Sequence, residues 1–347
     1  MQGGIAIAQL SPVVVPVFVS HLGCGHQCIF CDQRQFSKPV PPEDIPRLVH
    51  GFIAGSRDAD RRKRLIAFYG GSFTGIEESL FDRYLEEARQ LVEAGVVHGV
   101  KASTRPDLVT PERVERCRQA GFTELELGAQ SMDDAVLASS RRGHDSSDTI
   151  RAARLVHDSG MGLVLQIMPG LPGEDRASFI RTVEEVSRLA PDGVRIYPTV
   201  VLKGTPLERL YLNGEYQPLT LEEAVLRSLY GYARLSGAGC AVLRMGLPPL
   251  DAGNVTAGPH HPSFGFLVKA RAFRIMAEAL MERFGHGVEL MVNPADLPEL
   301  LGFRGENRKD LGFSFSYNDY LPRGYVQVQG PAERGCLQPK DIIEYIL

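Results

Sequence analysis

The chain has 347 residues, of which 44% are hydrophobic and 23% are charged. These values indicate a compact, core-forming protein with room for one large α/β domain and a smaller attachment. A formal net charge of −4 excludes a global attraction to nucleic acid, so a polyanionic partner would need a local basic patch. The apolar run at residues 12–19 is too short and too interrupted by proline to cross a bilayer, so we expect a cytoplasmic protein that does not bind membranes.

The six cysteines are unevenly distributed along the chain. Three lie within residues 24–31, whereas Cys117, Cys240 and Cys336 are isolated. This is a poor disulfide framework and a better metal-binding pattern for a reducing compartment.

Short apolar segments alternate with amphipathic stretches between residue 12 and about residue 200. The strand-like segments are VVVPVFVS, RLIAFYGG, VHGVKAST, FTELELGA, LVLQIMPG and GVRIYP. The stretch IEESLFDRYLEEARQLVEAG between the second and third has apolar residues at helical spacing, with Glu77 and Glu78 at its start and Gly95 at its end. Alternating β and α units predict a parallel sheet with helices packed outside it.

One face of these strands carries polar side chains, because residues two apart in a strand share a face. The polar set is Lys101, Ser103, Glu126, Gln130, Gln166, Arg195 and Tyr197. Bulky apolar residues fill the lumen of an ordinary parallel barrel, so this set favours an open barrel that holds a polar ligand. The alternative is a solvated sheet face, although parallel sheets normally bury both faces.

The pattern changes after about residue 205. A turn-rich segment leads to a predicted helix near residues 220–236, and a second helical run ends near residue 284. Residues 287–347 follow the order strand, helix, turn, helix, then short strands. We therefore expect a partial barrel over residues 1–205, a helical extension over residues 206–286 that covers it, and a small α+β module over residues 287–347.

The segment HLGCGHQCIFCDQ places Cys24, Cys28 and Cys31 at the spacing C-x3-C-x2-C, directly after the first predicted strand. Three thiolates from one loop can bind three irons of a 4Fe-4S cluster and leave the fourth iron without a protein ligand. A structural zinc site is the main alternative, with His21 or His26 as the fourth ligand.

This cysteine spacing after the first strand of a βα series resembles the signature of the radical S-adenosylmethionine (SAM) superfamily. The resemblance implies an α/β fold, a partial (β/α)6 barrel with a smaller α+β C-terminal extension. It also implies a 4Fe-4S cluster on the three cysteines, SAM bound to the open iron, and a one-electron reductant of the flavodoxin or ferredoxin type. Reductive cleavage of SAM would give a 5'-deoxyadenosyl radical that abstracts hydrogen from the substrate. Phe30 matches the aromatic residue that packs near the adenine in this family, and it would serve equally as a core residue anchoring the loop.

Two later motifs extend the resemblance along the strands. Gly70 and Gly71 in FYGGSF end the second strand where the family has GGE, and their missing side chains would let backbone groups approach the methionine amino group. Ser72 replaces the usual acid of that motif. KASTRPDLV resembles the third-strand motif of the Elongator-type relatives, which implies that Ser103, Thr104 or Arg105 lies at the polar end of the strand that would face SAM.

The fourth and fifth strands supply the remaining SAM contacts that the resemblance implies. Gln130 would face the ribose, Arg142 the carboxylate, and Gln166 stands where oxygen-independent coproporphyrinogen oxidase has an acidic ribose ligand. Tyr197 joins this set from the polar face of the sixth strand. Arg142 has a second interpretation, since Arg141 and Arg142 together could form a solvated helix end.

The later motifs resemble the Elongator catalytic subunit and its relatives together with the coproporphyrinogen oxidase group. This resemblance favours tRNA-base modification of the wobble-uridine type, with tRNA as partner and without an acetyltransferase domain. Radical chemistry on a porphyrinogen or another small metabolite is the second hypothesis. A non-catalytic protein that binds a cluster or haem is the third.

Other residues in the C-terminal half have both a functional and a structural interpretation. His260 and His261 could transfer protons or contact substrate, or they could be exposed residues of a turn stiffened by flanking prolines. Cys240 and Cys336 could donate hydrogen to a product radical, although a lone cysteine more often packs in a core. The basic run at residues 61–64 is consistent with a solvated loop.

Residues 288–330 resemble a small KH-type RNA-binding module. The predicted order is strand, helix, the G-x-x-G turn GFRG, helix, strand, strand. In such modules the glycine backbone approaches nucleic-acid phosphates, and Arg304, Arg308 and Lys309 would supply local positive charge. The alternative is a helical hairpin with a glycine cap and solvated charges.

Overall fold

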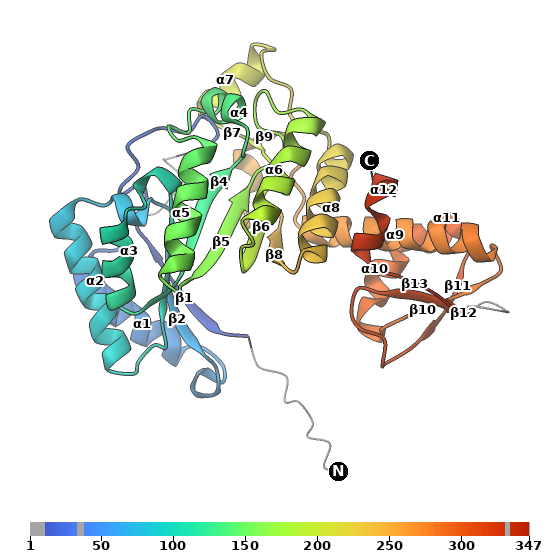
Figure 1. Cartoon of the computed structure of the whole chain (residues 1–347), viewed down its shortest axis with the longest axis horizontal. Coiled ribbons are helices and arrows are strands. Elements are labelled where there is room, and N and C mark those ends of the chain that lie inside the picture. The colour runs from blue at the N-terminus through green and yellow to red at the C-terminus, as the bar shows by residue number, and fades with distance from the viewer. Residues whose placement is uncertain (1–10, 33–37, 330–333, 347) are drawn as a thin grey trace. The chain divides into compact units, whose positions relative to one another are not determined.

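The computed structural model describes residues 11–32, 38–329 and 334–346. These divide into two compact units, one of residues 11–27, 32, 38–129 and 143–164 and the other of residues 28–31, 130–142, 165–329 and 334–346. Seven parallel strands form one half-barrel sheet in the order β1-β2-β3-β4-β5-β6-β8 (Figure 1). They are β1 (Val13–Phe18), β2 (Arg64–Tyr69), β3 (Val100–Thr104), β4 (Phe122–Gln130), β5 (Gly162–Ile167), β6 (Gly193–Ile196) and β8 (Ala241–Met245).

All six predicted strands are present, so the α/β prediction is confirmed. The seventh strand, β8, comes from the region that the sequence assigned to the helical extension, and it pairs with β6 in parallel register. Its side chains are only partly buried or exposed along its whole length. It therefore lacks the buried apolar alternation by which the other strands could be recognised.

The first unit packs helices against β1 to β4 through an aromatic core. Phe68 of β2 stacks on Phe73, with their ring centroids 4.5 Å apart, and Phe122 of β4 lies 5.2 Å from Phe73. The helices of this unit are α1 (Ile45–Ala54), α2 (Glu78–Glu93), α3 (Pro111–Gln119) and α5 (Ser146–Asp158). The helix predicted from IEESLFDRYLEEARQLVEAG is thus confirmed as α2, and Glu77 caps it by accepting hydrogen bonds from the Ser79 and Leu80 backbone amides.

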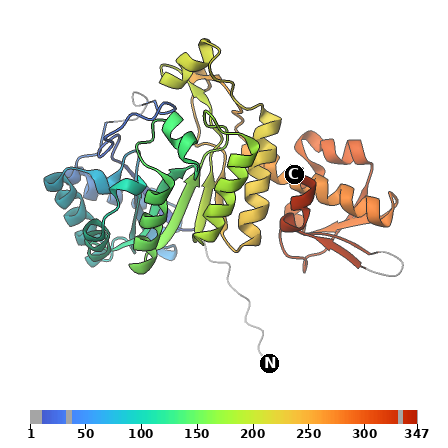
Figure 2. The same cartoon turned by 45° about the horizontal axis from the view of Figure 1, so that its top comes forward.

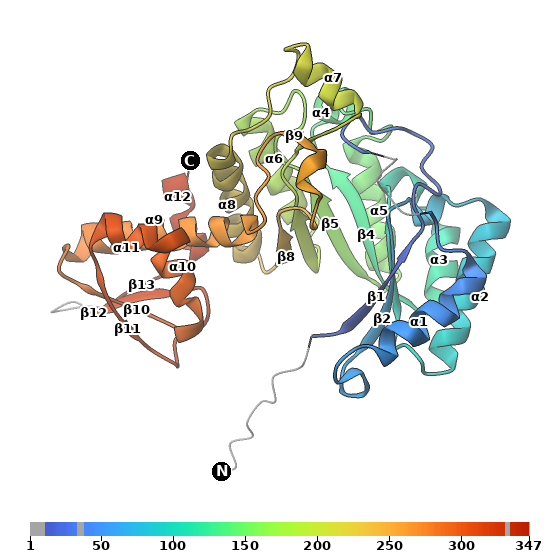
Figure 3. The ribbon, with the colours of Figure 1, turned by 180° about the vertical axis from the view of Figure 1, so that it is seen from behind.

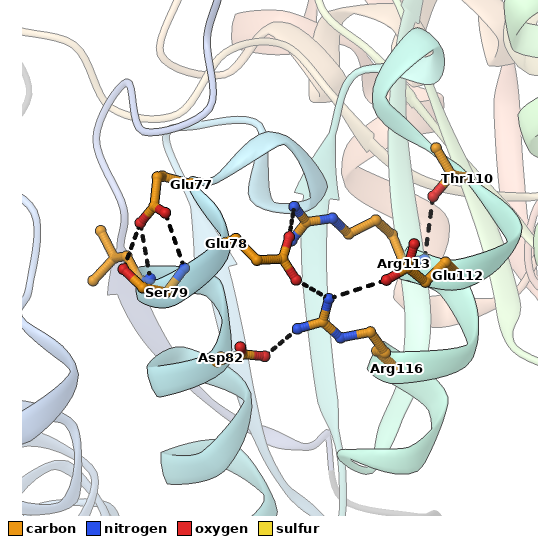
Figure 4. Close-up of polar contacts among 9 residues, drawn as sticks. Glu77, Glu78, Ser79, Asp82, Thr110, Glu112, Arg113 and Arg116 are labelled. Atoms are coloured by element: carbon orange, nitrogen blue, oxygen red, sulfur yellow. Dashed lines mark hydrogen bonds and ion pairs between the residues drawn. The ribbon is translucent and has the colours of Figure 1, made fainter.

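Charged side chains join α2 to α3 within this unit (Figure 4). Arg116 pairs with both Glu78 and Asp82, and Arg113 pairs with Glu78 at 2.6 Å. The Arg113 guanidinium also lies over the Phe81 ring, 4.2 Å from its centroid. Because these charges pair with one another across the two helices, the cluster stabilises the packing of α3 on α2.

The second unit contains a longer series of helices. They are α4 (Asp134–Ser139), α6 (Arg176–Arg188), α7 (Pro206–Leu212), α8 (Leu221–Gly237) and α9 (Phe264–Phe284). α6 packs against α8 (Figure 3). The short strands β7 (Val201–Leu202) and β9 (Val255–Ala257) pair antiparallel near α7 (Figure 1). The predicted helices near residues 220–236 and up to residue 284 are α8 and α9. No helix in the described ranges is both long and apolar enough to cross a membrane.

The end of the chain forms a separate small sheet in the order β11-β10-β12-β13, packed beside α9 (Figure 2). Its elements are β10 (Glu289–Val292), α10 (Leu297–Leu301), α11 (Glu306–Leu311), β11 (Ser314–Tyr317), β12 (Val326–Gln329), β13 (Arg334–Leu337) and α12 (Ile343–Ile346). β10 pairs in parallel with β11 and antiparallel with β12. The order predicted for this segment is observed, with the GFRG turn between α10 and α11.

Candidate cofactor and substrate site

The first part of the cysteine segment folds against the turn that follows β2. The Ser72 amide donates to the Leu22 carbonyl at 2.9 Å, and the Cys24 sulfur lies 3.5 Å from the Ser72 hydroxyl. Ser72 is buried. The residue that replaces the expected acid therefore contacts the cysteine segment itself.

The two glycines of this turn are required for different reasons. A Cβ on Gly71 would lie 2.5 Å from the Val19 carbonyl oxygen, so a side chain there would displace the chain that leads to the cysteines. Gly70 has room for a Cβ, but its φ of +86° is disfavoured for other residues. The packing of the cysteine segment is thus sufficient to explain why residue 71 is glycine. That backbone groups of both glycines approach the methionine amino group of SAM remains a prediction.

At the end of β3, three consecutive residues have different environments. Ser103 is partly buried on the face that also carries Lys101, whereas the buried Thr104 hydroxyl bonds to the Thr74 hydroxyl at 2.6 Å. Arg105 is buried and donates two hydrogen bonds to Asp107, at 3.0 and 2.7 Å. Its Nη1 is buried and has no partner among the described residues, which leaves a cationic donor for a ligand.

The rest of the cysteine segment belongs to the second unit. Cys28 is buried, and the Arg142 Nη1 donates a hydrogen bond to its sulfur at 2.9 Å. Arg142 is itself buried, so the interpretation of this residue as part of a solvated helix end is wrong. The backbone of Ile29 is fixed on both sides, since its amide donates to Ser140 and its carbonyl accepts from Leu207.

Gln130 and Gln166 form a pair on one face of the second unit. The Gln166 amide nitrogen donates to the Gln130 side-chain oxygen at 3.0 Å. The side-chain nitrogen of Gln130 and the side-chain oxygen of Gln166 take no part in this bond. They suit ribose hydroxyls, because a hydroxyl both donates and accepts hydrogen bonds. Gln130 also has a left-handed φ of +66°, the kind of backbone strain that is concentrated at functional sites.

Phe30 packs among apolar residues of the segments that follow β4, β5 and β6. It packs with Tyr197 against the buried cluster of Val136, Met168 and Leu171, and it also contacts the cluster around Ile29 and Leu207. Tyr197 accepts a hydrogen bond from Arg195 at 3.4 Å on the same strand face. Phe30 therefore anchors the cysteine segment, and this role is compatible with packing on an adenine ring.

Two predicted residues lie in another part of the second unit. His260 and His261 are partly buried and line a cavity of about 160 Å³. The structure therefore does not place them on an exposed turn. Arg244 of β8 lines the same cavity, and it could not be predicted as a site residue because AVLRM was not recognised as a strand.

Cys240 is buried beside the end of α8, as the packing interpretation predicts, and burial raises the pKa of its thiol. Cys336 is exposed on β13.

Glu174 is a buried acid that the sequence did not single out. Its Oε1 accepts from the Gly170 amide at 2.7 Å and from Arg227 at 2.8 Å, while its Oε2 has no partner in the described residues. Burial raises the pKa of Glu174 to about 7 in spite of Arg227. A proton on Oε2 would break no hydrogen bond, which is consistent with the raised pKa.

The donor set is consistent with a 4Fe-4S cluster. None of the three cysteines forms a disulfide with a described residue, and a buried guanidinium donates to the sulfur of one of them. Hydrogen bonds to sulfur are one of the means by which a protein tunes such a cluster. Among the described residues, no three His, Cys, Asp or Glu side chains lie in a metal-ligating arrangement, and the cysteine triplet is included in this statement. Residues 33–37, which follow the triplet, lie outside the described ranges.

Two family models match the chain. One, described as the radical SAM superfamily, matches residues 19–186, and the other, the radical SAM C-terminal domain, matches residues 191–274. The tRNA uridine(34) acetyltransferase of Methanocaldococcus infernus is 35% identical over 253 residues, which cover 61% of this chain and 47% of that protein. The protein of the same name from Methanocaldococcus jannaschii is 31% identical over 199 residues, covering 56% and 36%.

A human relative and a solved structure complete the comparison. Elongator complex protein 3 of Homo sapiens is 34% identical over 138 residues, which cover 38% of this chain and 25% of that protein. The solved structure of the archaeal Elp3 of Methanocaldococcus infernus has a TM-score of 0.58 and 23% identity, and the match covers 80% of this chain and 64% of that one. This likeness supports the fold, and the chain spans less than half the length of the uridine(34) acetyltransferases it matches.

Proposed function

The chain belongs to the radical SAM superfamily and uses a 4Fe-4S cluster and SAM, and from this premise we propose that it modifies a tRNA base of the wobble-uridine type. The observation that carries the proposal is the similarity of more than half of the chain to two proteins named tRNA uridine(34) acetyltransferase. That similarity concerns shared residues and fold, so the acetyl transfer in the relatives' name is not part of the proposal.

We assign the cofactor ligands as follows. Cys24, Cys28 and Cys31 hold the cluster, and Arg142 orients the buried Cys28 sulfur through its hydrogen bond. When bound, the reduced cluster and SAM supply a 5'-deoxyadenosyl radical that abstracts hydrogen from substrate. An external one-electron reductant of the flavodoxin or ferredoxin type delivers the electron.

The remaining proposed SAM contacts follow residue by residue from the resemblance to the family. In the second unit, Gln130 and Gln166 bind the ribose and Phe30 packs on the adenine, next to Tyr197. In the first unit, Gly70 and Gly71 present backbone groups, and the contacts at the end of β3 come from Ser103 and from the unpaired Nη1 of Arg105. Thr104 is assigned a structural role, because Thr74 already occupies its hydroxyl.

The small C-terminal module is proposed to bind the RNA backbone. Gly302 and Gly305 flank the turn with φ of +78° and +75°, and a Cβ on Gly305 would meet only the end of Lys309, 4.0 Å away. Asn307 holds the turn in place, because its buried amide donates to the Ala270 and Leu300 carbonyls. The turn is thus rigid and open, with exposed basic side chains of Arg304, Arg308 and Lys309 beside it.

The proposal is tested by the nucleosides of tRNA from a strain that lacks the gene. Mass spectrometry should show one uridine-derived nucleoside at the wobble position lost or replaced by its precursor. Complementation with the wild-type gene should restore it, and complementation with Cys28→Ala should not. An unchanged set of tRNA nucleosides, together with an accumulated small metabolite, would favour the small-molecule hypothesis instead.

A further inference from the structure

The cavity that His260 and His261 line is placed where a substrate group would be expected. It begins at Pro198, two residues beyond the end of β6, and includes the loop that follows β8, up to Leu250. Ligands of open parallel sheets bind outside the carboxyl ends of the strands. Pro198 also directly follows Tyr197, which packs with Phe30 on the proposed SAM side of the same unit.

Each of the three polar side chains of this cavity can donate a hydrogen bond. Arg244 is held by two bonds to its own loop, from Nε to the Gly246 carbonyl at 3.2 Å and from Nη2 to the Leu247 carbonyl at 2.9 Å. No bond from its Nη1 to another described residue is found, so this nitrogen is available to a ligand. The His261 Nδ1 accepts from the Ser263 amide at 3.1 Å, which places the ring proton on Nε2.

The cavity lining has no carboxylate, and its other walls are apolar. Prolines, Leu250 and Phe264 supply rigid surfaces around the three donor side chains. A ligand that matches this lining is flat, presents carbonyl oxygens and carries no amino group that would face the donors. Uracil has two carbonyl acceptors on a planar ring, whereas cytosine replaces one of them by an amino donor.

The cavity is next to the proposed RNA-backbone site. The His261 ring meets the Phe303 ring edge to face, with centroids 5.5 Å apart and planes at 87°. Phe303 belongs to the GFRG turn, and the Arg304 guanidinium lies 5.3 Å from the centre of the Phe303 ring. An RNA strand whose phosphate contacts this turn would therefore have a neighbouring base within reach of His261.

We propose that this cavity binds the uracil base of an RNA strand, with Arg244, His260 and His261 as the groups that select it. This inference rests on the proposed function, since it names the subsite for the base that the enzyme modifies. Base selection then depends on donor groups from β8 and from the loop before α9, separately from the groups that bind SAM.

The test uses the anaerobically reconstituted full chain and two fluorescent RNA heptamers of adenosines, one with a central uridine and the other with a central cytidine. The uridine heptamer should bind about fivefold more tightly or better, the effect of one or more hydrogen bonds. Arg244→Gln and His260→Ala should each reduce this preference to less than about twofold. Arg151→Gln and His286→Ala, at exposed positions, serve as matched controls and should keep it.

A 4-thiouridine heptamer gives a second measurement that does not depend on variants. Its photocrosslink should map to the peptide segment that includes residues 244–264. The proposal is overturned if the wild type shows no preference for uridine, if both variants keep the preference, or if the crosslink maps elsewhere. Stimulation of SAM cleavage by tRNA, measured in parallel, distinguishes the two proposals. Stimulation without uridine preference would contradict the cavity alone, and uridine preference without stimulation would contradict the proposed function alone.

Discussion

At the scale of single residues, Arg142 makes the most informative contact with the cysteine segment. A buried guanidinium that donates to the Cys28 sulfur stabilises negative charge there, and the reduced cluster carries one more negative charge than the oxidised cluster. Arg142→Gln should therefore lower the midpoint potential of the reconstituted cluster. If the differential interaction is about 1 kcal/mol, the shift for a one-electron couple is roughly 40 mV.

Redox titration followed by electron paramagnetic resonance measures this shift, with iron content determined on the same samples. Arg142→Lys keeps the charge and should shift the potential less. An Arg142→Gln cluster with full iron content and the wild-type potential would show that the contact to Cys28 does not tune the cluster.

Glu174 gives a pH prediction at the same scale. Its folded-state pKa of about 7 lies above the ordinary value of 4.5, so the folded chain binds this proton more tightly than the unfolded chain. The protonated Glu174 therefore makes its full contribution to the free energy of unfolding below about pH 4.5, and this contribution is lost as the pH rises through about 7. The total loss is up to about 3 kcal/mol. Glu174→Gln mimics the protonated form and should remove this part of the pH dependence.

Urea unfolding of the wild type and the Glu174→Gln variant at pH 5 and pH 8 measures the direction of this pH dependence. The two proteins should have similar free energies of unfolding at pH 5, and the variant should be the more stable at pH 8. A variant that is less stable at pH 8 would mean that Glu174 stays ionised beside Arg227.

At the scale of elements, the contact between α2 and α3 allows the contribution of an ion pair to stability to be compared with that of side-chain packing. Asp82 is 60% exposed, so its pair with Arg116 is a surface ion pair and Asp82→Asn should change the free energy of unfolding by less than about 0.5 kcal/mol. Arg113 is 18% exposed and covers the Phe81 ring, so Arg113→Ala should cost about 1–2 kcal/mol through lost contact with the ring. Chemical denaturation of both variants measures the difference, and equal effects would contradict the ranking.

The GFRG turn provides the second element-scale prediction. Gly305→Asp adds bulk and negative charge at the proposed phosphate contact, and it should weaken tRNA binding at least tenfold and flatten its salt dependence. Gly305 has a left-handed φ of +75°, which strains any side chain, but aspartate tolerates this region better than most residues and an added Cβ meets only the end of Lys309, so folding should be maintained.

Gly312→Asp is the matched control, because Gly312 has the same left-handed backbone and no neighbour within 4 Å of an added Cβ. Equal loss of tRNA affinity in the two variants would indicate a general charge effect. Unchanged affinity in Gly305→Asp would leave the turn with a structural role only.

At the scale of the whole molecule, local patterns were enough for most of the fold but not for the contacts of the site. Periodic apolar residues identified six strands and the helices α2, α8 and α9, because each buries one face in a core. β8 was missed, since its side chains stay largely exposed. The bond between Arg142 and Cys28 joins residues 114 positions apart, and no spacing rule reaches over that separation.

The same distinction holds for the predicted site residues. The hydrogen bond between Gln130 and Gln166 confirms that they lie on the same face of the sheet, as the alternation of polar and apolar residues predicted. The resemblance of KASTRPDLV to the family motif offered Ser103, Thr104 or Arg105 as SAM contacts, and in the structure consecutive strand residues point to opposite faces and Thr104 pairs with Thr74. The cavity of Arg244, His260 and His261 is assembled from separate loops, so only the structure could bring these groups together.

The central claim is that this chain is a radical SAM enzyme acting on tRNA, and the most direct measurement is 5'-deoxyadenosine formed by the anaerobically reduced protein with and without tRNA from a strain lacking the gene. We predict that the wild type forms 5'-deoxyadenosine, that this tRNA increases its yield several times over, and that replacing Cys24, Cys28 and Cys31 by alanine abolishes it. A wild-type protein that binds one zinc per chain and cleaves no SAM would contradict the assignment as a radical SAM enzyme. SAM cleavage that is the same with and without tRNA would contradict the proposal that tRNA is the substrate.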